Sequence, residues 1–222
     1  MNNKEIKLMT INHNKTKRNY LERMINSKVN CMIEAKKYEK NYWDGPRKYG
    51  YGGYKYIPDR WKGVAKKLIK KFNLKNNSSV LDVGCGKAFI LYEIRKILPK
   101  IDITGFDISK HAIKNVPKEI KKNIFISKAQ DKYPFKKKTF DLTISTACLH
   151  NLEINEIKKA INEIERVSKK KFIMVESYRN EKELFNLQCW ALTCKSFFSK
   201  KEWEWIFKEF GYKGNYEFIY FK

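Results

Sequence analysis

The amino-acid sequence predicts an α/β fold with a doubly wound, mostly parallel β-sheet, preceded by an N-terminal helical and aromatic extension. In residues 61–222, short apolar runs typical of buried strands alternate with segments whose apolar residues recur every three or four positions, as on one face of a helix. Strands that alternate with helices form parallel sheets through right-handed crossovers. The 222 residues have room for one such domain and an extension. We therefore expect an extension over residues 1–60 and a single domain over residues 61–222.

The predicted elements follow one another regularly along the chain. In the extension, apolar residues near positions 20–25 and 29–33 favour one or two short amphipathic helices. From Trp61 onward, the apolar residues Val64, Leu68 and Phe72 share one helical face. Strands are expected at residues 80–83, 101–108, 123–127, 140–146, 172–177 and 215–221. Helices are expected between them at residues 87–98, 109–116, 154–164 and 199–210.

The net charge of +24 invites a nucleic-acid partner, but its composition weakens that interpretation. The basic residues are 41 lysines and 7 arginines, a skew that A- and T-rich codons produce, and arginine is the better bidentate ligand of phosphate. Much of the lysine precedes predicted strands and so belongs to the amino end of the sheet, whereas ligands bind at the carboxyl end. Nucleic acid is therefore not the expected substrate, although a secondary binding surface for it stays open.

The cysteines and the lengths of the apolar runs indicate the cellular compartment in which the protein is expected. The five cysteines form no CxxC pair, which favours reduced thiols and no metal site, as in a cytoplasmic protein. The sequence has no run of about 18 apolar residues, so no transmembrane helix is expected. Its start lacks the apolar centre of a secretion signal. We expect a cytoplasmic monomer or homodimer without a membrane partner.

A glycine-rich turn follows the first strand of the predicted domain, in the stretch VLDVGCGKAF. Gly84 and Gly86 lack the Cβ that would keep a ligand away from the backbone at the carboxyl edge of the sheet. Asp107 ends the next strand, where a carboxylate can accept both ribose hydroxyls of a nucleoside. Asp82 stands where a dinucleotide-binding turn has an apolar residue, and it would repel a pyrophosphate but suit an ammonium group. The methionine end of S-adenosylmethionine carries such a group.

At these residues the chain resembles the class I (Rossmann-like) S-adenosylmethionine-dependent methyltransferases, over roughly residues 60–180. VLDVGCGKAF looks like their first motif, ITGFDIS like their second-strand acid, and DKYPFKKKTFDLTIST like the segment that enters their fourth strand. The resemblance implies S-adenosylmethionine as cofactor, with Asp107 on its ribose. The residues expected at the cofactor are Asp82, Gly84, Cys85, Gly86, Asp107, Ile108, Gln130 and Asp131.

Two positions depart from the family pattern. The third glycine of the turn is Ala88 here, a change small enough that cofactor binding is expected to survive. The family's third-strand acid, which often meets the adenine amino group, falls near Ala129 and Gln130. Gln130 or Asp131 is expected to take its place.

His150, in the stretch CLHNL just beyond the fourth strand, is the best-placed histidine for a general base. The alternative is that it packs or caps the following helix. Tyr178 and Arg179 leave the same edge after the fifth strand, and Arg179 could pair with an acidic group of the acceptor or remain solvated. Cys85 and Cys148 flank the site and are expected to be packing residues.

The segment of residues 42–61, YWDGPRKYGYGGYKYIPDRW, is expected to form a lid over the site. Glycines permit tight turns, and aromatic faces suit the sulfonium charge. The candidate lid residues are Tyr51, Tyr54, Tyr56, Arg60 and Trp61. A packing arm without ligand contact and a base-stacking surface are the alternatives. The carboxyl-terminal part, including Trp190, is expected to complete the acceptor pocket.

The expected function is methyl transfer from S-adenosylmethionine to an oxygen or nitrogen of a small metabolite, by in-line displacement. One rival is an RNA methyltransferase, which the charge would favour. Another is a binding module that keeps the fold and the cofactor without performing transfer.

Overall fold

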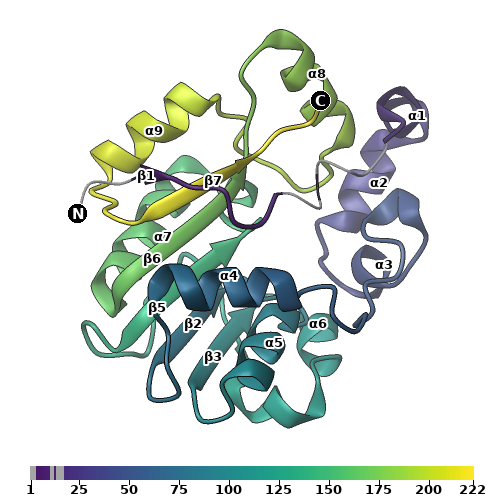
Figure 1. Cartoon of the computed structure of the whole chain (residues 1–222). Coiled ribbons are helices and arrows are strands. Elements are labelled where there is room, and N and C mark those ends of the chain that lie inside the picture. Colours follow the sequence, from purple (N-terminus) through teal and green to yellow (C-terminus); the bar gives the residue numbers. More distant parts are fainter. Residues whose placement is uncertain (1–3, 11–12, 14–17) are drawn as a thin grey trace.

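The computed structural model describes residues 4–10, 13 and 18–222, and these residues build a single β-sheet with helices around it (Figure 1). The described strands lie in the order β1-β7-β6-β5-β2-β3-β4, and each neighbouring pair is parallel. The strands are β1 (Lys4–Glu5), β2 (Ser79–Val83), β3 (Asp102–Asp107), β4 (Ile124–Ile126), β5 (Phe140–Thr146), β6 (Ser168–Glu176) and β7 (Asn215–Ile219). The predicted doubly wound sheet is confirmed, and it is parallel throughout.

Helices cover both faces of the sheet because successive strand residues point to opposite faces. Val80 packs with Leu68 and Leu91 of α4 and α5, whereas Leu81 packs with Ile161 of α7 on the other face. The α-helices are α1 (Tyr20–Ile25), α2 (Lys28–Ala35), α3 (Lys40–Trp43), α4 (Lys62–Phe72), α5 (Phe89–Ile97), α6 (Lys110–Lys114), α7 (Ile154–Val167), α8 (Glu181–Trp190) and α9 (Lys200–Glu209). Short 3₁₀ helices are η2 (Arg47–Tyr49), η3 (Lys118–Asn123) and η4 (Leu149–Asn151).

Several elements differ from the sequence-based expectation, among them β6 and α8. Strand β6 begins at Ser168, four residues before the predicted start, and its lysine-rich beginning pairs in register with β5. There the Lys171 side chain is buried, and its ammonium pairs with Glu165 at 2.7 Å. Helix α8 was not predicted because it has no single apolar stripe; its buried side chains include Glu183 and Asn186.

The start of the extension belongs to the sheet. Strand β1 pairs with β7 at the sheet edge, and the chain then runs past Glu217. The buried Glu217 carboxylate accepts hydrogen bonds from the backbone amides of Leu8, Met9 and Thr10 at 2.8, 2.8 and 2.9 Å. Three charge-assisted bonds satisfy a carboxylate that burial would otherwise disfavour. This contact fastens the extension to the last strand of the fold.

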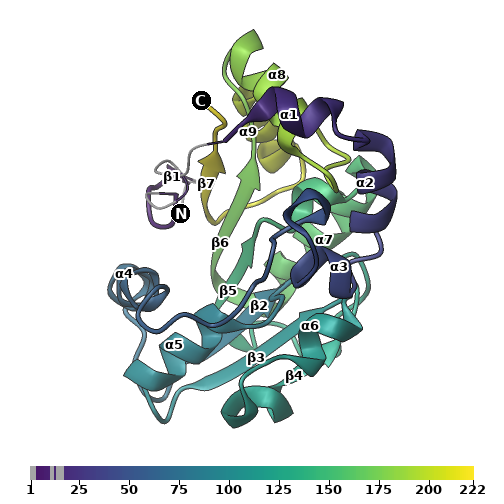
Figure 2. The ribbon, with the colours of Figure 1, turned by 90° about the vertical axis from the view of Figure 1, so that its right-hand side faces the viewer.

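The rest of the extension lies across the edge of the sheet at which the strands end. Because all strands are parallel, their carboxyl ends meet at one edge, and Figures 1 and 2 show α1, α2 and α3 beside it. The predicted one or two N-terminal helices are confirmed as α1 and α2. Within the described part of the chain, each helix is too short or too polar to cross a membrane.

Candidate active site

Two adjoining cavities open at the carboxyl edge of the sheet. The first, the Asp107 cavity, has a volume of about 280 Å³ and is lined by the ends of β3 and β5 and by the extension. The second, the Trp190 cavity, has a volume of about 410 Å³ and reaches from the glycine turn to the end of α8. Both lie where parallel α/β sheets bind ligands. The two cavities share the lining residues Tyr42, Trp43, Tyr51, Gly84, Thr146, Ala147 and Thr193.

The glycine turn after β2 borders both cavities, because Gly84 lines both and Gly86 lines the Trp190 cavity. Gly84 and Gly86 have φ angles of 74° and 56°, in the left-handed region that glycine adopts without strain. A Cβ on Gly84 would lie 2.4 Å from Cys148 Sγ, and one on Gly86 would lie 2.7 Å from the Trp43 ring. Ala88 takes a φ of 56°, so the position of the family's third glycine keeps the glycine-like conformation with a small side chain.

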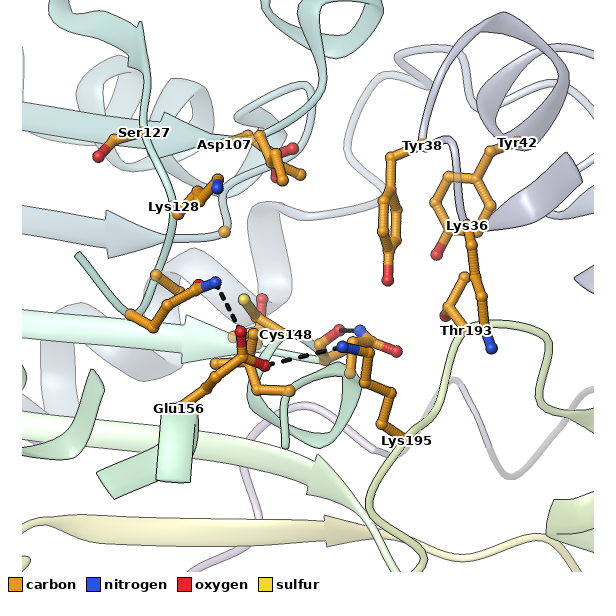
Figure 3. Close-up of a pocket in the computed structure, with 18 of the residues that line it drawn as sticks. Lys36, Tyr38, Tyr42, Asp107, Ser127, Lys128, Cys148, Glu156, Thr193 and Lys195 are labelled. Atoms are coloured by element: carbon orange, nitrogen blue, oxygen red, sulfur yellow. Dashed lines mark hydrogen bonds and ion pairs between the residues drawn. The ribbon is translucent and has the colours of Figure 1, made fainter. Parts of the chain in front are cut away.

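Asp107 is held rigidly at the end of β3. Its Oδ2 accepts a hydrogen bond from the Gly86 amide at 2.8 Å, and its Oδ1 accepts one from the Ser109 amide at 2.9 Å. Burial raises the pKa of this carboxyl, against the effect of those amide bonds. Each oxygen retains acceptor capacity toward the cavity, because a carboxylate offers about four lone-pair sites. In Figure 3, Asp107 lies across the cavity from Tyr38 and Tyr42.

Asp82 is a buried acid within β2 with an incomplete set of hydrogen bonds. Its Oδ1 has no hydrogen-bond partner among the described residues, and burial, with the neighbouring Asp107, raises its pKa to about 8. It does not line either cavity. A cationic group close to this unpaired, buried carboxyl would stabilise its ionised form.

The other expected cofactor residues divide into two groups. Ile108 and Gln130 line the Asp107 cavity, and the exposed Ile108 side chain offers an apolar surface there. The Gln130 amide donates to Glu156 at 3.0 Å, and Figure 3 shows Glu156 at the cavity wall. Cys85 lines the Trp190 cavity with Gly86. Asp131 lines neither cavity, so Gln130 is the better placed of the two alternatives.

The aromatic segment is packed down onto the glycine turn. The Trp43 ring stacks on Tyr51 with centroids 5.1 Å apart, and its Nε1 donates to Ser109 Oγ at 2.9 Å. Asp44 accepts hydrogen bonds from the buried Lys87 ammonium at 2.7 Å and lies 2.7 Å from His111 Nε2. Trp43 and Asp44 therefore latch the segment to residues next to Gly86 and Asp107.

Four of the five candidate lid residues line the Trp190 cavity. These are Tyr51, Tyr54, Arg60 and Trp61. Tyr56 lines neither cavity; its hydroxyl donates to Glu93 on α5. Trp190, expected near the acceptor, lines the Trp190 cavity.

His150 lies behind the cavity wall and lines neither cavity. Its Nδ1 accepts a hydrogen bond from the Glu176 amide at 3.1 Å, which leaves the ring proton on Nε2, 3.5 Å from Glu176 Oε2. Burial lowers the pKa of His150 to about 3, so the ring is neutral. These contacts make His150 a packing residue that orients Glu176.

Tyr178 and Arg179 also lie outside both cavities. Tyr178 forms a β-bridge with Ser199. The Arg179 guanidinium is paired with Glu183 and lies over the Tyr220 ring, 4.2 Å from its centroid. The structure therefore does not bring Arg179 to the acceptor side.

The thiols next to the site are protonated packing groups. Burial raises the pKa of Cys148 to about 12 and that of Cys85 well above its usual range. A thiol must ionise to act as a nucleophile. Cys148 instead fills the space that the missing Cβ of Gly84 leaves.

Sequence reasoning missed Glu176, the last residue of β6 and a lining residue of the Trp190 cavity. Burial raises its pKa to about 7, although Arg18 and Lys28 act in the opposite direction. The sequence signal that could have identified Glu176 is the one that identified Asp107. Each is an acidic residue at the end of an apolar strand. Other lining residues that sequence reasoning did not identify are Arg18, Arg23, Arg47 and Thr193.

Class I S-adenosylmethionine-dependent methyltransferases bring cofactor and acceptor together at the carboxyl edge of such a sheet, beside a glycine turn and a strand-end acid. The protein is an enzyme of this class. Residues 74–211 match the family model described as a methyltransferase domain, and the chain belongs to that family. Its cofactor is S-adenosylmethionine.

Individual relatives cover only part of the chain. Arginine-hydroxylase NDUFAF5 of Mus musculus is 32% identical over 110 residues, which are 49% of this chain and 31% of that protein. Ribosomal RNA small subunit methyltransferase C of Buchnera aphidicola is 38% identical over 108 residues, 47% and 30% of the respective chains. The matched part of this chain thus spans about a third of the length of each of these two relatives. The YcgJ protein of Bacillus subtilis shares the fold, with a TM-score of 0.51 at 18% identity over 66% of each chain.

Proposed function

We propose that the protein transfers the methyl group of S-adenosylmethionine to an oxygen or nitrogen of a small-molecule acceptor by in-line displacement, with Glu176 as general base. The observation that carries this proposal is the position of Glu176. It lines the Trp190 cavity, which adjoins the Asp107 cavity at Gly84. An acceptor in the Trp190 cavity would thus have a carboxylate on one side and the cofactor on the other.

The residues of the two cavities fit the cofactor. Asp107 offers free lone pairs to the ribose hydroxyls, and Ile108 and Gln130 offer an apolar surface and an amide to the adenine. A methionyl ammonium beside the glycine turn would favour the ionised form of the unpaired Asp82 carboxyl, whose pKa burial raises to about 8. When bound, S-adenosylmethionine supplies a methyl group already activated by its sulfonium.

The chain's own contribution is to position the acceptor, exclude water and remove a proton. Alignment of two reactants in one site lowers the activation free energy of their reaction by roughly 7–11 kcal/mol. Glu176, with a pKa of about 7, is poised to take the acceptor proton near neutral pH. His150, the histidine that the sequence places best for this role, orients the Glu176 carboxylate through Nε2.

Residues 1–60 form the proposed extension and lid, and residues 61–222 the proposed catalytic domain. The lid segment covers the carboxyl edge, and the cavities beneath it have volumes of small-molecule sites. The lysines that begin or precede strands, such as Lys100 and Lys170, belong to the amino edge. These features favour a small acceptor. The five free cysteines suit a reducing compartment such as the cytoplasm.

The rival function is RNA methylation, which the net charge of +24 and the Buchnera aphidicola relative favour. One experiment separates the two. The protein is incubated with methyl-tritiated S-adenosylmethionine and either the small-metabolite fraction or total RNA of a cell extract. We expect label in a small metabolite, with transfer that falls far less steeply with salt than RNA methylation would. Label in RNA alone, falling steeply with salt, would contradict the small-molecule proposal.

The Asp44 latch provides a test of the lid. In Asp44→Ala, the Lys87 ammonium, 4% exposed, loses its carboxylate partner, and such a loss costs about 3 kcal/mol. Thermal denaturation should then show a Tm roughly 6–12 °C lower, at about 2–4 °C per kcal/mol for a chain of this size. Acceptor turnover should fall as well, because the lid is no longer fastened beside Gly86.

The double variant Asp44→Ala/Lys87→Met is the matched control. Removing the unpaired ammonium should recover much of the Tm while turnover stays low. If the double variant turns over the acceptor at the wild-type rate, the latch is not needed for catalysis.

A further inference from the structure

Three arginines surround one tryptophan at the end of α8. The guanidinium carbons of Arg18, Arg23 and Arg47 lie 5.3, 4.8 and 5.1 Å from the centroid of the Trp190 ring. Arg18 and Arg23 come from the region of α1, and Arg47 comes from η2 in the lid. All four side chains line the Trp190 cavity, and we call them the arginine cluster.

The described lining of the Trp190 cavity carries a net positive charge. Glu176 is the only carboxylate among the described lining residues of the Trp190 cavity, and Arg60 adds a fourth guanidinium. Burial, followed by repulsion from Arg47, lowers the pKa of Arg23 to about 10. Burial and repulsion from Arg18 lower that of Arg47 as well. Like charges that lie close together are stabilised by an anion between them.

Composition does not explain this cluster. The chain has 41 lysines and only 7 arginines. Yet the described lining of the Trp190 cavity includes four of those arginines and no lysine. Arginine differs from lysine in its planar fork, which binds carboxylate or phosphate with two parallel hydrogen bonds and stacks on aromatic rings.

The arginines are also held in place. Arg23 Nη1 donates to the backbone oxygen of Arg47 at 2.7 Å, and Arg47 Nη1 donates to the Gly50 oxygen at 2.6 Å. Arg23 Nε has no hydrogen-bond partner among the described residues. Arg23 and Arg47 therefore have fixed positions, and Arg23 retains unused donor capacity, as a preorganised anion site requires.

We infer that the methyl acceptor is an anionic small molecule whose carboxylate or phosphate group binds the arginine cluster beside Trp190. This inference rests on the proposed function, because it places the acceptor in the Trp190 cavity. The apolar body of the acceptor lies against the aromatic wall formed by Tyr42, Tyr51 and Tyr54. Binding by its acidic end holds the acceptor in one orientation between Glu176 and the glycine turn.

The test uses pairs of aromatic probes that differ in charge, titrated by calorimetry into wild-type protein saturated with S-adenosylhomocysteine. The pairs are benzoate with benzamide and phenyl phosphate with phenol. We expect at least one anion to bind about tenfold or more tightly than its neutral counterpart, and the two pairs distinguish carboxylate from phosphate recognition. Equal affinities within both pairs would overturn the inference. This arm needs no variant and is independent of any folding defect.

Variants then locate the site. Arg23→Gln/Arg47→Gln should remove the preference for the anion, whereas the matched control Arg95→Gln should retain it, because Arg95 lines neither cavity. Affinity for S-adenosylhomocysteine should be unchanged in both proteins. If the double variant instead loses affinity for S-adenosylhomocysteine, the cluster serves the cofactor and the inference fails while the proposed methyl transfer stands. Anion binding by the cluster in a protein that methylates no acceptor would leave the site intact and refute the proposed function.

Discussion

Replacing Glu176 by Gln is expected to lower kcat by about 10²–10⁴-fold, the usual contribution of a general base. Gln keeps the shape and polarity of the side chain but cannot accept a proton. The base must be ionised to act, so the wild-type kcat/KM should rise with pH through an apparent pKa of about 7, and this limb should be absent in Glu176→Gln. The measurement is turnover against pH with the acceptor found by tritium labelling.

The same variant is expected to be more stable than the wild type above neutral pH. Because the folded-state pKa of Glu176 is raised to about 7, its contribution to stability is present below the unfolded pKa and is lost as pH rises through 7. The ionised carboxyl then destabilises the protein by roughly 3 kcal/mol, because raising a pKa by one unit corresponds to about 1.36 kcal/mol. Glu176→Gln should thus have a higher Tm than the wild type at pH 8 and a similar Tm at pH 4. A variant that loses stability at pH 8 but retains turnover would assign Glu176 a structural role.

Asp107→Ala is expected to weaken S-adenosylhomocysteine binding by about 10²–10⁴-fold, since two charge-assisted hydrogen bonds to the ribose contribute about 1.5–3 kcal/mol each. The Gly86 amide, which donates to Asp107, borders the Trp190 cavity and can bind water instead. The buried Ser109 amide loses its partner, at a cost of about 1–3 kcal/mol that is smaller than the usual stability of a folded domain. The fold should therefore survive, as near-UV circular dichroism would show. Calorimetry measures the affinity.

Asp131→Ala is the matched control for this prediction. Asp131 is an acid on the same side of the sheet but lines neither cavity. Its removal should leave S-adenosylhomocysteine affinity unchanged. Unchanged affinity in Asp107→Ala as well would remove the β3 acid from the cofactor site.

The cofactor half of the site could be predicted because its signals are local in the sequence. Gly84 and Gly86 lie within one strand-turn-helix segment, and Asp107 ends the next strand, so the order of elements alone places them together. The predicted start of β6 is four residues too late because the strand begins with lysines, which lack the apolar pattern of a buried strand. Pairing with β5 sets the register of these residues.

The acceptor half could not be predicted because distant segments assemble it. Arg23, Arg47 and Trp190 meet only when the extension packs on α8, and no spacing in the sequence reports that contact. Because arginine is scarce in the sequence and its residues are spread along the chain, the sequence does not indicate that four of them line one cavity. His150 was placed at the correct edge of the sheet, but its side-chain direction depends on tertiary packing, which turns the ring toward the Glu176 backbone.

The most direct test of this account is a crystal structure of the protein with S-adenosylhomocysteine. We expect the ribose hydroxyls on the Asp107 carboxylate, the adenine between Ile108 and Gln130, and the homocysteine end crossing Gly84 toward Trp190. A nucleoside bound outside these two cavities, or turned so that its sulfur faces away from Glu176, would contradict it.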